Sequence, residues 1–412
     1  MSASNPARVT LHPVIVLSLL VGLIVSTVGD EIFMVIMVLQ LEQLSSSGYV
    51  IALLLASQLL PGVFLSPFAG QLIDRFETSR VLVITQILQA LLLWALAFTE
   101  SPVLLLTGSL VLGLLFAVSQ PAIYALVPVI AERGGVAVNR VNAVMEFFRR
   151  SALIVGPVLG GILFQAGGAR LGLLIDALTF GLAGCVVLFI GIRRHPEVTD
   201  KTKKLFDGAL EGLRVIARDP VLRVTMPVVL AGFSATSLVN VAFVFLVRDV
   251  LGGSAGTYGF LYAMWGSGML LGAFLAGRRE LTSGLERPTL LGSVFIGASL
   301  LTTGLFPRFL VMAISEFCGG VANGIHNVSL RTLLTVRTPK ALHGRVFAAY
   351  LAVGNAAIMT GYLLGSPFAN RFAVPLYLTA GSLTILISLF GYLRILPLKN
   401  TPGIGPDDTP DT

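Results

Sequence analysis

Two adjacent acidic residues, Asp30 and Glu31, are the only charged residues between Arg8 and Glu42, in a strongly apolar stretch of the sequence. A carboxyl group can accept and release a proton. Because an ionisable group in hydrocarbon costs several kcal/mol, one that occurs there usually has a function. Neighbouring residues of a helix point ~100° apart, so both cannot face the same cavity squarely. Asp30 and Glu31 are therefore proton-coupling candidates, and a carboxyl group bonded to a neighbouring helix for structure alone is the alternative.

A second set of polar residues lies in an apolar stretch at 309–336. Asn323, His326 and Asn327 are spaced i, i+3, i+4, and Glu316 precedes His326 by nearly three helical turns. A polar stripe on a membrane helix must meet a cavity or polar partners. Imidazole titrates near physiological pH, so Glu316 and His326 are further proton-coupling candidates, and Asn323 and Asn327 are substrate-cavity candidates. A structural histidine with satisfied hydrogen bonds is the alternative.

Glu146, Arg149 and Arg150 form a charged group near the start of a predicted helix at 141–166. Their i, i+3 and i+4 spacing favours local ion pairs. The group is either a structural or gating element near the membrane surface, where long side chains reach water, or a site for an anionic part of a substrate. On the second interpretation Arg149 and Arg150 are substrate-cavity candidates. Asp176, in the next predicted helix, is interpreted as a charge that stabilises a helix start.

Nothing in the sequence indicates covalent chemistry. It contains no nucleotide-binding loop of the form G-x-x-x-x-G-K-[ST], no His or Cys pair at metal-ligand spacing and no catalytic motif. Cys185 and Cys318 fall within predicted apolar helices and are interpreted as free, small hydrophobic residues. We expect no enzymatic activity, no cofactor and no metal.

The elements that must position these residues are membrane helices. Of the 412 residues, 55% are hydrophobic and only 12% charged, with a mean hydropathy of +0.89, whereas soluble domains carry about 25% charged residues. Apolar runs long enough to cross ~30 Å of hydrocarbon recur along the chain. We predict an all-α integral membrane protein with twelve transmembrane helices, at 12–38, 49–69, 81–98, 103–130, 141–166, 170–192, 224–247, 257–277, 289–306, 309–336, 344–369 and 374–396.

Positive charge is distributed unevenly over the loops. With the N-terminus placed in the cytoplasm, the outer loops hold only Arg170, Arg248, Arg308 and Arg371, and the other 24 of the 28 Lys and Arg residues fall on the cytoplasmic side. The positive-inside rule accounts for this bias, so the net charge of +7 requires no nucleic acid as partner. We expect a multi-pass protein of the cell (inner) membrane, embedded in the lipid bilayer, with both termini cytoplasmic.

The longest polar interval, 193–223, divides the chain nearly equally. Within it, apolar residues between Leu205 and Ile216 follow helical spacing, with Asp207, Glu211 and two arginines on the other face. This pattern predicts an amphipathic helix at the cytoplasmic interface. The predicted domains are an N-terminal six-helix bundle at 1–192, a cytoplasmic linker at 193–223, a C-terminal six-helix bundle at 224–396 and a disordered cytoplasmic tail at 397–412.

The two halves also show a faint repeat at a constant offset of 205 residues. The matched pairs are Arg140-Val141 with Arg345-Val346, Gly156 with Gly361, and Gly160 with Gly365. A chain of six plus six spans with a half-length repeat is typical of transporters built from two pseudo-symmetric bundles, with the substrate site between them near mid-membrane. We expect such a chain to act as a monomer.

A run of charges, "GQLIDRFETSR" at 70–80, interrupts the apolar sequence in the loop predicted between spans two and three. It resembles motif A of the major facilitator superfamily, G-x-L-x-D-R-x-x-x-R, at Gly70, Asp74, Arg75 and Arg80, among others, while Glu77 replaces the usual second glycine. The resemblance implies a cytoplasmic gating motif that latches the two bundles in the outward-open state.

A second motif, "SALIVGPVLGG", lies in the predicted span at 141–166. Gly156 and Gly160 form a small-xxx-small pair that lets helices pack closely, and Pro157 favours a kink. With Gly161, these residues resemble motif C, G-P-x-x-G-G, of drug/proton antiporters. A tight helix crossing without any antiporter role is the alternative.

Further strings resemble the branch of this superfamily that holds macrolide-efflux proteins and the enterobactin exporter. They are "VGDEI", "PAIYALVP", "LLIDALTFGLAG" and "HGRV". The first string favours Asp30 over Glu31 as the residue that faces the cavity. The span at 103–130 lacks the arginine of motif B, so a proton relay built on that arginine does not transfer to this chain.

Together these observations predict a secondary active exporter of small amphipathic, drug-like molecules, a multidrug-resistance type of antiporter that exchanges its substrate for protons by alternating access. A siderophore or lysolipid transporter of the same fold is one alternative. A non-transporting membrane receptor or scaffold is another, although such proteins usually gain a soluble domain.

Overall fold

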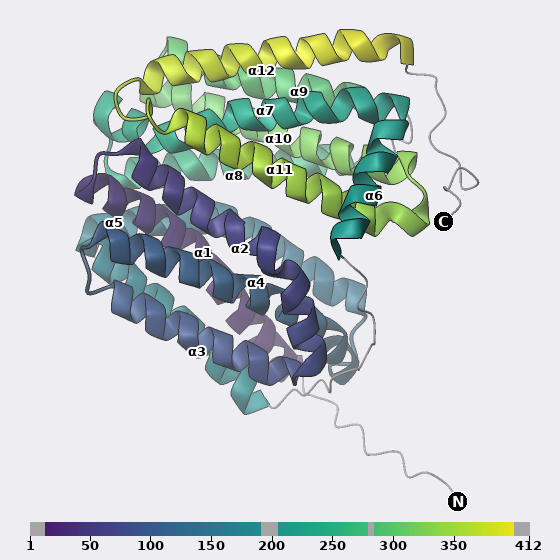
Figure 1. The fold of residues 1–412 in the computed structure, drawn as a ribbon. Helices are drawn as coiled ribbons and strands as arrows, with labels where there is room; N and C mark the ends of the chain where they lie inside the picture. Colours follow the sequence, from purple (N-terminus) through teal and green to yellow (C-terminus); the bar gives the residue numbers. More distant parts are fainter. Residues whose placement is uncertain (1–12, 191–204, 279–283, 399–412) are drawn as a thin grey trace, which may run out of the picture. The chain divides into compact units, whose positions relative to one another are not determined.

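The computed structural model describes residues 13–190, 205–278 and 284–398, and these residues form helices and short connections without any strand (Figure 1). The long helices are α1 (Pro13–Leu44), α2 (Gly48–Arg75), α3 (Thr78–Leu96), α4 (Pro102–Arg133), α5 (Val138–Ile190), α6 (Leu205–Arg218), α7 (Pro220–Phe245), α8 (Ala255–Gly277), α9 (Glu286–Leu305), α10 (Phe309–Arg337), α11 (His343–Gly365) and α12 (Ala373–Ile395). Three short helical turns, η1 (Leu246–Val250), η2 (Lys340–Leu342) and η3 (Leu396–Leu398), complete the described elements. The predicted all-helical class is confirmed.

Nine helices within the described part of the chain are long and apolar enough to cross a membrane. One of them, α5, covers two predicted spans. Its backbone leaves helical geometry at Gly167 and Gly168, and Gly168 has φ 65°, in the left-handed region that glycine adopts without a steric penalty. We call residues 138–166 its first stretch and residues 169–190 its second stretch. The break falls where the sequence predicted a turn between spans five and six.

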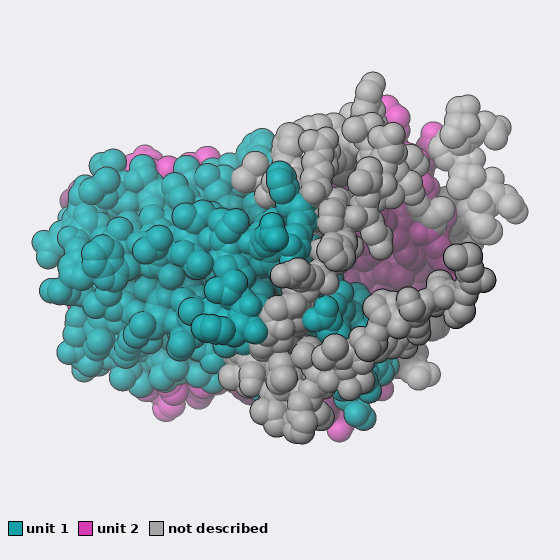
Figure 2. Space-filling model, turned by 90° about the horizontal axis from the view of Figure 1, so that it is seen from below, with its two compact units in different colours: residues 1–44, 57–201 teal, residues 45–56, 202–412 magenta. Residues whose placement is uncertain are grey.

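The chain forms two compact units, coloured separately in Figure 2. Unit 1 comprises residues 1–44 and 57–201, and unit 2 comprises residues 45–56 and 202–412. In unit 1, α5 packs along α1 and α3, and α3 packs on α4. In unit 2, α10 packs on α8 and α9, α12 on α9 and α7, and α11 on α7 and α6. The predicted domain boundaries at 192 and 223 stay a prediction.

The first turns of α2 belong to unit 2. Nδ2 of Asn370 donates a hydrogen bond to the carbonyl oxygen of Ser46 (2.6 Å), and Gly48 packs against the backbone of Ser366. The division between the units therefore falls inside a helix, after Ala56, because the ends of this helix find their contacts in different units.

The glycines matched by the half-length repeat lie at equivalent helix contacts in each unit. A methyl group added at Gly156 would overlap Cβ of Glu31 on α1, and one at Gly361 would overlap the carbonyl oxygen of Ser234 on α7. Gly160 approaches α1 in the same way, and Gly365 approaches α7. The first stretch of α5 thus meets α1 as α11 meets α7, through small residues that let two backbones come close.

Helix α6 covers the residues predicted to form an amphipathic helix, and it packs on α11 within unit 2. Glu211 forms an ion pair with Arg345, and Gly212 lies against the carbonyl oxygen of the same arginine. Val215 and Ile216 are buried, whereas Leu213, which the spacing placed on the apolar face, is 38% exposed. The buried face therefore contacts protein, and the position of α6 relative to the membrane stays a prediction.

Candidate proton-coupling site

The acidic residues of α1 lie against both stretches of α5 within unit 1. Asp30 is half-buried, and its Oδ1 atom is buried with no hydrogen-bond partner among the described residues. Two neighbouring carboxyl groups, Asp176 and Glu31, act on Asp30 electrostatically. Because adjacent residues of a helix point in different directions, Glu31 instead faces Gly156 and lies within electrostatic reach of Arg149.

Asp176 belongs to this site, and its interpretation as a helix-start charge is wrong. The second stretch of α5 begins just after Gly168, so Asp176 lies about two turns inside it. Its side chain is 0% exposed and reaches α1 beside Gly29, where an added methyl group would overlap Oδ1 of Asp176. The hydroxyl group of Thr179 lies 3.2 Å from that oxygen and donates to it or to the Asp176 carbonyl oxygen, 2.8 Å away. An acidic residue in an apolar run was the signal that could have identified Asp176, as it identified Asp30.

The predicted local ion pairs of α5 are present. Nε and Nη2 of Arg149 each lie 2.9 Å from one carboxylate oxygen of Glu146, a forked geometry that fixes both groups. Nε of Arg150 lies 2.8 Å from Oε1 of the same carboxylate. Arg149 also lies within electrostatic reach of Glu31 and Tyr124, so it connects the pair on α5 with α1 and α4. A role of either arginine in a substrate cavity stays a prediction.

In unit 2, His326 on α10 bonds to α9. Its Nδ1 atom lies 2.8 Å from the carbonyl oxygen of Thr289 and 3.0 Å from Oγ of Ser293. A carbonyl oxygen can only accept, so the Nδ1 atom carries a proton. The other nitrogen, Nε2, is buried without a partner among the described residues, and the ring meets Phe233 edge-on at 6.0 Å between centroids. His326 is thus held structurally through one nitrogen, while the other is unsatisfied.

The remaining polar residues of α10 have different neighbours. Nδ2 of Asn327 donates to the backbone and side-chain oxygens of Asn323, at 3.0 and 2.8 Å. Glu316 is buried and lies within electrostatic reach of Tyr377 on α12. The predicted stripe therefore does not form one network, because His326 bonds to α9 while the two asparagines bond to each other.

The residues of the predicted gating motif are helical for most of their length. Helix α2 continues to Arg75 and α3 begins at Thr78, so the motif is not the loop that the sequence predicted. The side chains of Gly70, Asp74 and Arg75 lie outside the described part of the structure. Nε of Arg80 lies 2.7 Å from Oε2 of Glu77, the residue that replaces the second motif glycine. The departure from the motif thus supplies a local partner for one of its arginines.

The second motif does not break its helix. Pro157 lies inside α5, whose non-helical torsions are at Gly167 and Gly168, and the kink predicted at this proline stays a prediction. Gly156 and Gly160 serve the close contact with α1, and Gly161 is also buried. The packing role of these glycines is established, and their antiporter role stays a prediction.

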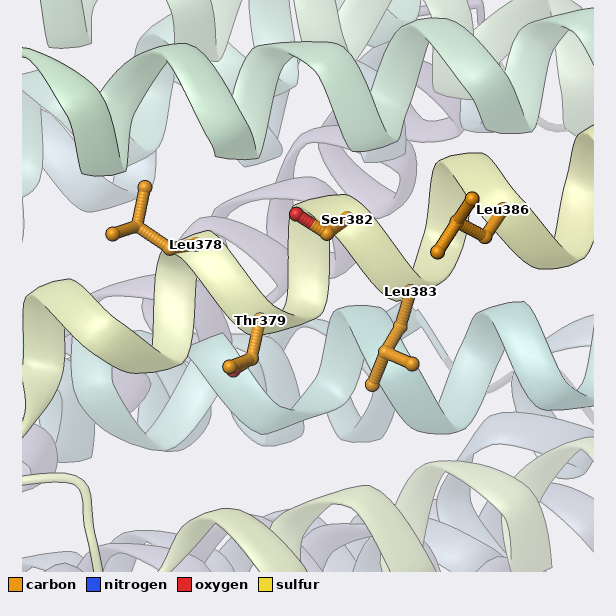
Figure 3. A pocket seen from close by; sticks show the side chains of 5 residues that line it. All are labelled: Leu378, Thr379, Ser382, Leu383 and Leu386. Atoms are coloured by element: carbon orange, nitrogen blue, oxygen red, sulfur yellow. The ribbon is translucent and has the colours of Figure 1, made fainter.

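Among the described residues, no group of three or more His, Cys, Asp or Glu side chains could hold a metal ion. A shallow hollow lies on the surface of α12, lined by Leu378, Thr379, Ser382, Leu383 and Leu386 (Figure 3). All five residues come from this one helix, and their side chains are mostly apolar. None of the candidate site residues lines this hollow, so it is not part of the candidate site.

Comparisons with known proteins place the chain in a transporter family. It matches the family model of the Major Facilitator Superfamily over residues 19–362. The multidrug efflux pump Tap of Mycobacterium tuberculosis is 25% identical over 396 residues, which cover 92% of this chain and 92% of Tap. Macrolide efflux protein A of Streptococcus pyogenes is 22% identical over 397 residues, which cover 92% of this chain and 96% of that protein.

A solved structure of the nucleoside transporter NupG has the same fold. Its TM-score is 0.75 over 93% of this chain and 99% of NupG, and at 12% identity the likeness concerns the fold alone. This chain belongs to the Major Facilitator Superfamily and is a multi-pass membrane protein. The predicted family is confirmed, and the two efflux proteins among its relatives agree with the predicted branch.

Proposed function

We propose that this chain is a secondary active exporter of small amphipathic, drug-like molecules, driven by protons that enter in exchange. The proton-coupling part of this proposal rests on Asp30 in α1. Its carboxyl group is half-buried, and its Oδ1 atom has no described hydrogen-bond partner. A proton carrier needs this freedom, because a carboxylate fixed by an arginine, as Glu146 is by Arg149, is held in its charged form.

The export direction and the substrate class draw support from the relatives. Tap is named for multidrug efflux and macrolide efflux protein A for macrolide efflux, and each aligns with nearly the whole of this chain. At 22–25% identity the residues that contact a substrate can differ between relatives, so macrolides are the first compounds to test rather than the assigned substrate.

The proposed architecture is twelve spans in two six-helix bundles. The two stretches of α5 correspond to spans five and six, and α6 connects the bundles on the cytoplasmic side. Alternating access then places a substrate site between the bundles near mid-membrane. The matched glycine contacts of α5 with α1 and of α11 with α7 support the pseudo-symmetry.

Each group of candidate residues takes one role in this proposal. Asp30 exchanges protons, with Glu31, Glu316 and His326 as further carriers. The gating motif, Gly70, Asp74, Arg75 and Arg80, latches the cytoplasmic side, and the motif Gly156, Pro157, Gly160 and Gly161 lets α5 pack on α1. The substrate cavity includes Asn323, Asn327, Arg149 and Arg150.

The proposal is tested by proton flux in inverted membrane vesicles acidified inside. An exported compound moves into such vesicles and a proton moves out, so macrolides and other amphipathic cations should raise the internal pH in a dose-dependent manner. Asp30→Asn should abolish this response while leaving the protein in the membrane. Compound accumulation that persists without a proton gradient, or flux unchanged in Asp30→Asn, would contradict proton coupling through this residue.

We also propose that both termini lie in the cytoplasm of a monomer in the cell membrane. Single cysteines introduced at Arg194 and at the exposed Phe76 in a variant lacking Cys185 and Cys318 should both resist an impermeant thiol reagent applied from outside the cell. A cysteine at Arg308 should react and serves as the control for an outer loop. Reaction at either of the first two sites would contradict the topology.

A further inference from the structure

Asp176 is a fully buried carboxyl group with an unsatisfied atom. Its side chain is 0% exposed, and Oδ2 has no hydrogen-bond partner among the described residues. The hydroxyl group of Thr179 lies beside Oδ1. Because Gly29 has no side chain, the Asp176 carboxyl group reaches the backbone of α1 next to Asp30.

The ionisable groups that α1 presents on this side are acidic. Asp176 and Glu31 both act on Asp30 electrostatically. The segment of α1 before Asp30, residues 13–29, contains no charged residue. Asp30 and Asp176 thus lie on neighbouring helices, and each has one carboxyl oxygen without a described hydrogen-bond partner. The sequence of α1 contains no Lys or Arg that could neutralise either group.

Three of the four arginines of α5 have described partners elsewhere. Arg149 and Arg150 bind Glu146, and the guanidinium group of Arg170 lies over the ring of Phe98, 4.5 Å from its centroid. The fourth, Arg140, belongs to the first turn of the helix, at the opposite end of the first stretch from Gly168. The described contacts of the Asp176 side chain are therefore with Gly29 and Thr179.

In the described part of the chain, α3 and α4 also pack on α5, and neither shows a cation in contact with this pair. On α3 the one charged residue is Arg80, which binds Glu77 at the start of the helix. On α4, Tyr124 faces Arg149, and the charged residues Glu132 and Arg133 end the helix.

We propose that Asp30 and Asp176 form a carboxyl pair that holds one exchangeable proton between α1 and the second stretch of α5, which makes Asp176 a second proton-coupling residue. Two neighbouring carboxylates repel each other strongly where the dielectric constant is low. A single proton on the pair removes that repulsion, and the protonated oxygen can donate a hydrogen bond to the other carboxylate. The inference deepens the proposed function and rests on it for the role in transport.

The pair is tested without any substrate. Infrared spectra of the purified full-length protein, reconstituted in lipid and titrated with pH, report protonated carboxyl groups through their C=O stretching band. The samples are wild type, Asp30→Asn, Asp176→Asn and the double variant. Asp249→Asn, a change at an exposed residue of η1, is the matched control. Gel-filtration profiles and circular dichroism select the variants that fold.

A coupled pair predicts that each single variant shifts the midpoint of the band's titration, that the double variant loses this transition, and that Asp249→Asn keeps it. The proposal is overturned if one single variant loses the transition while the other leaves the midpoint unchanged, because a lone carboxyl group would then account for it. No change in any variant overturns it too. A transition that moves with Na⁺ concentration at fixed pH would assign the site to a cation instead.

The vesicle assay separates this inference from the proposed function. If the titration is coupled and Asp176→Asn also abolishes compound-driven proton flux, the carboxyl pair and the proposed function are both supported. A coupled titration with wild-type flux in both single variants would retain the shared proton but overturn the coupling role of Asp176 and of Asp30. Loss of flux in Asp30→Asn alone, with an uncoupled titration, would retain the proposed function and overturn the pair.

Discussion

Asp219 and Arg337 are joined within unit 2 by a buried ion pair, with Nε of Arg337 2.9 Å from both carboxylate oxygens of Asp219. Oδ1 of the same carboxylate accepts hydrogen bonds from the backbone nitrogens of Val221 and Leu222, at 2.9 and 2.8 Å, and so caps α7. One side chain thereby fixes the start of α7 and the end of α10, through two residues that lie 118 positions apart in the sequence.

Asp219→Ala should therefore be strongly destabilising. It removes the cap, worth about 1 kcal/mol, and it removes a buried carboxylate partner of Arg337, a loss that costs up to about 3–5 kcal/mol in comparable pairs. The thermal unfolding midpoint of the purified protein should fall by several degrees. Asp219→Asn keeps an acceptor for the cap and should lose less. Asp249→Ala, at an exposed position, is the control; equal midpoints for all three variants would contradict the role of the pair.

Larger side chains at the matched glycines should disrupt both units in the same way. Gly156→Val would collide with Glu31 on α1, and Gly361→Val would collide with Ser234 on α7. Overpacking of this kind costs about 1–3 kcal/mol, and we expect both variants to lose stability and compound-driven flux. Gly181→Ala, also in α5 but with open space at its Cβ position, should keep stability or gain up to about 1 kcal/mol. If Gly156→Val were as stable and active as Gly181→Ala, the close contact would be unimportant.

Substitutions of His326 should separate the structural role of its Nδ1 atom from a coupling role of its Nε2 atom. The side-chain amide of Asn can donate near the position of Nδ1, whereas that of Gln reaches the position of Nε2. His326→Asn should therefore keep the hydrogen bond to Thr289 and remain more stable than His326→Gln, by about 1 kcal/mol. If the unsatisfied Nε2 atom takes part in coupling, His326→Asn keeps its thermal midpoint and loses proton flux. A lower midpoint for Asn than for Gln would contradict the assigned tautomer.

Breaking the exposed ion pairs of α5 should hardly affect stability. The side chains of Glu146 and Arg149 are 41% and 46% exposed, and pairs at such positions contribute about 0–1 kcal/mol. Glu146→Gln should therefore unfold within a few degrees of wild type. Because the substitution frees Arg149 and Arg150, any change it causes in compound-driven flux reports a gating or substrate-binding role. A large fall in the unfolding midpoint would instead show that the pairs are structural.

The sequence was sufficient to predict the helices because hydrophobic run length and charge position determine where a membrane helix can lie. The break in α5 falls in the gap predicted between two apolar runs, and the helix α6 followed from its period of apolar residues. The small-xxx-small spacing predicted a close helix contact at Gly156, without indicating that α1 is its partner. Each of these features depends on local sequence, which is why they could be read from it.

The neighbours of each polar side chain could not be predicted in the same way. Spacing placed Glu316, His326 and the two asparagines on one helix face, yet which neighbouring helix each one meets depends on the packing of α8 and α9 on α10. Asp176 was missed because its position near a predicted helix start offered a simpler interpretation. Only the approach of α1 at Gly29 reveals that its carboxyl group lies against the residue that precedes Asp30.

Helix α1 is held from two directions by a single neighbour. The first stretch of α5 locks into it at Gly156 and Gly160, and the second stretch brings Asp176 to it at Gly29. A change of charge at Asp176 would therefore act on α1, the same helix that Gly156 and Gly160 contact. The two stretches of α5, joined at Gly167 and Gly168, thus connect the proposed proton site with the glycine contact through one segment of chain.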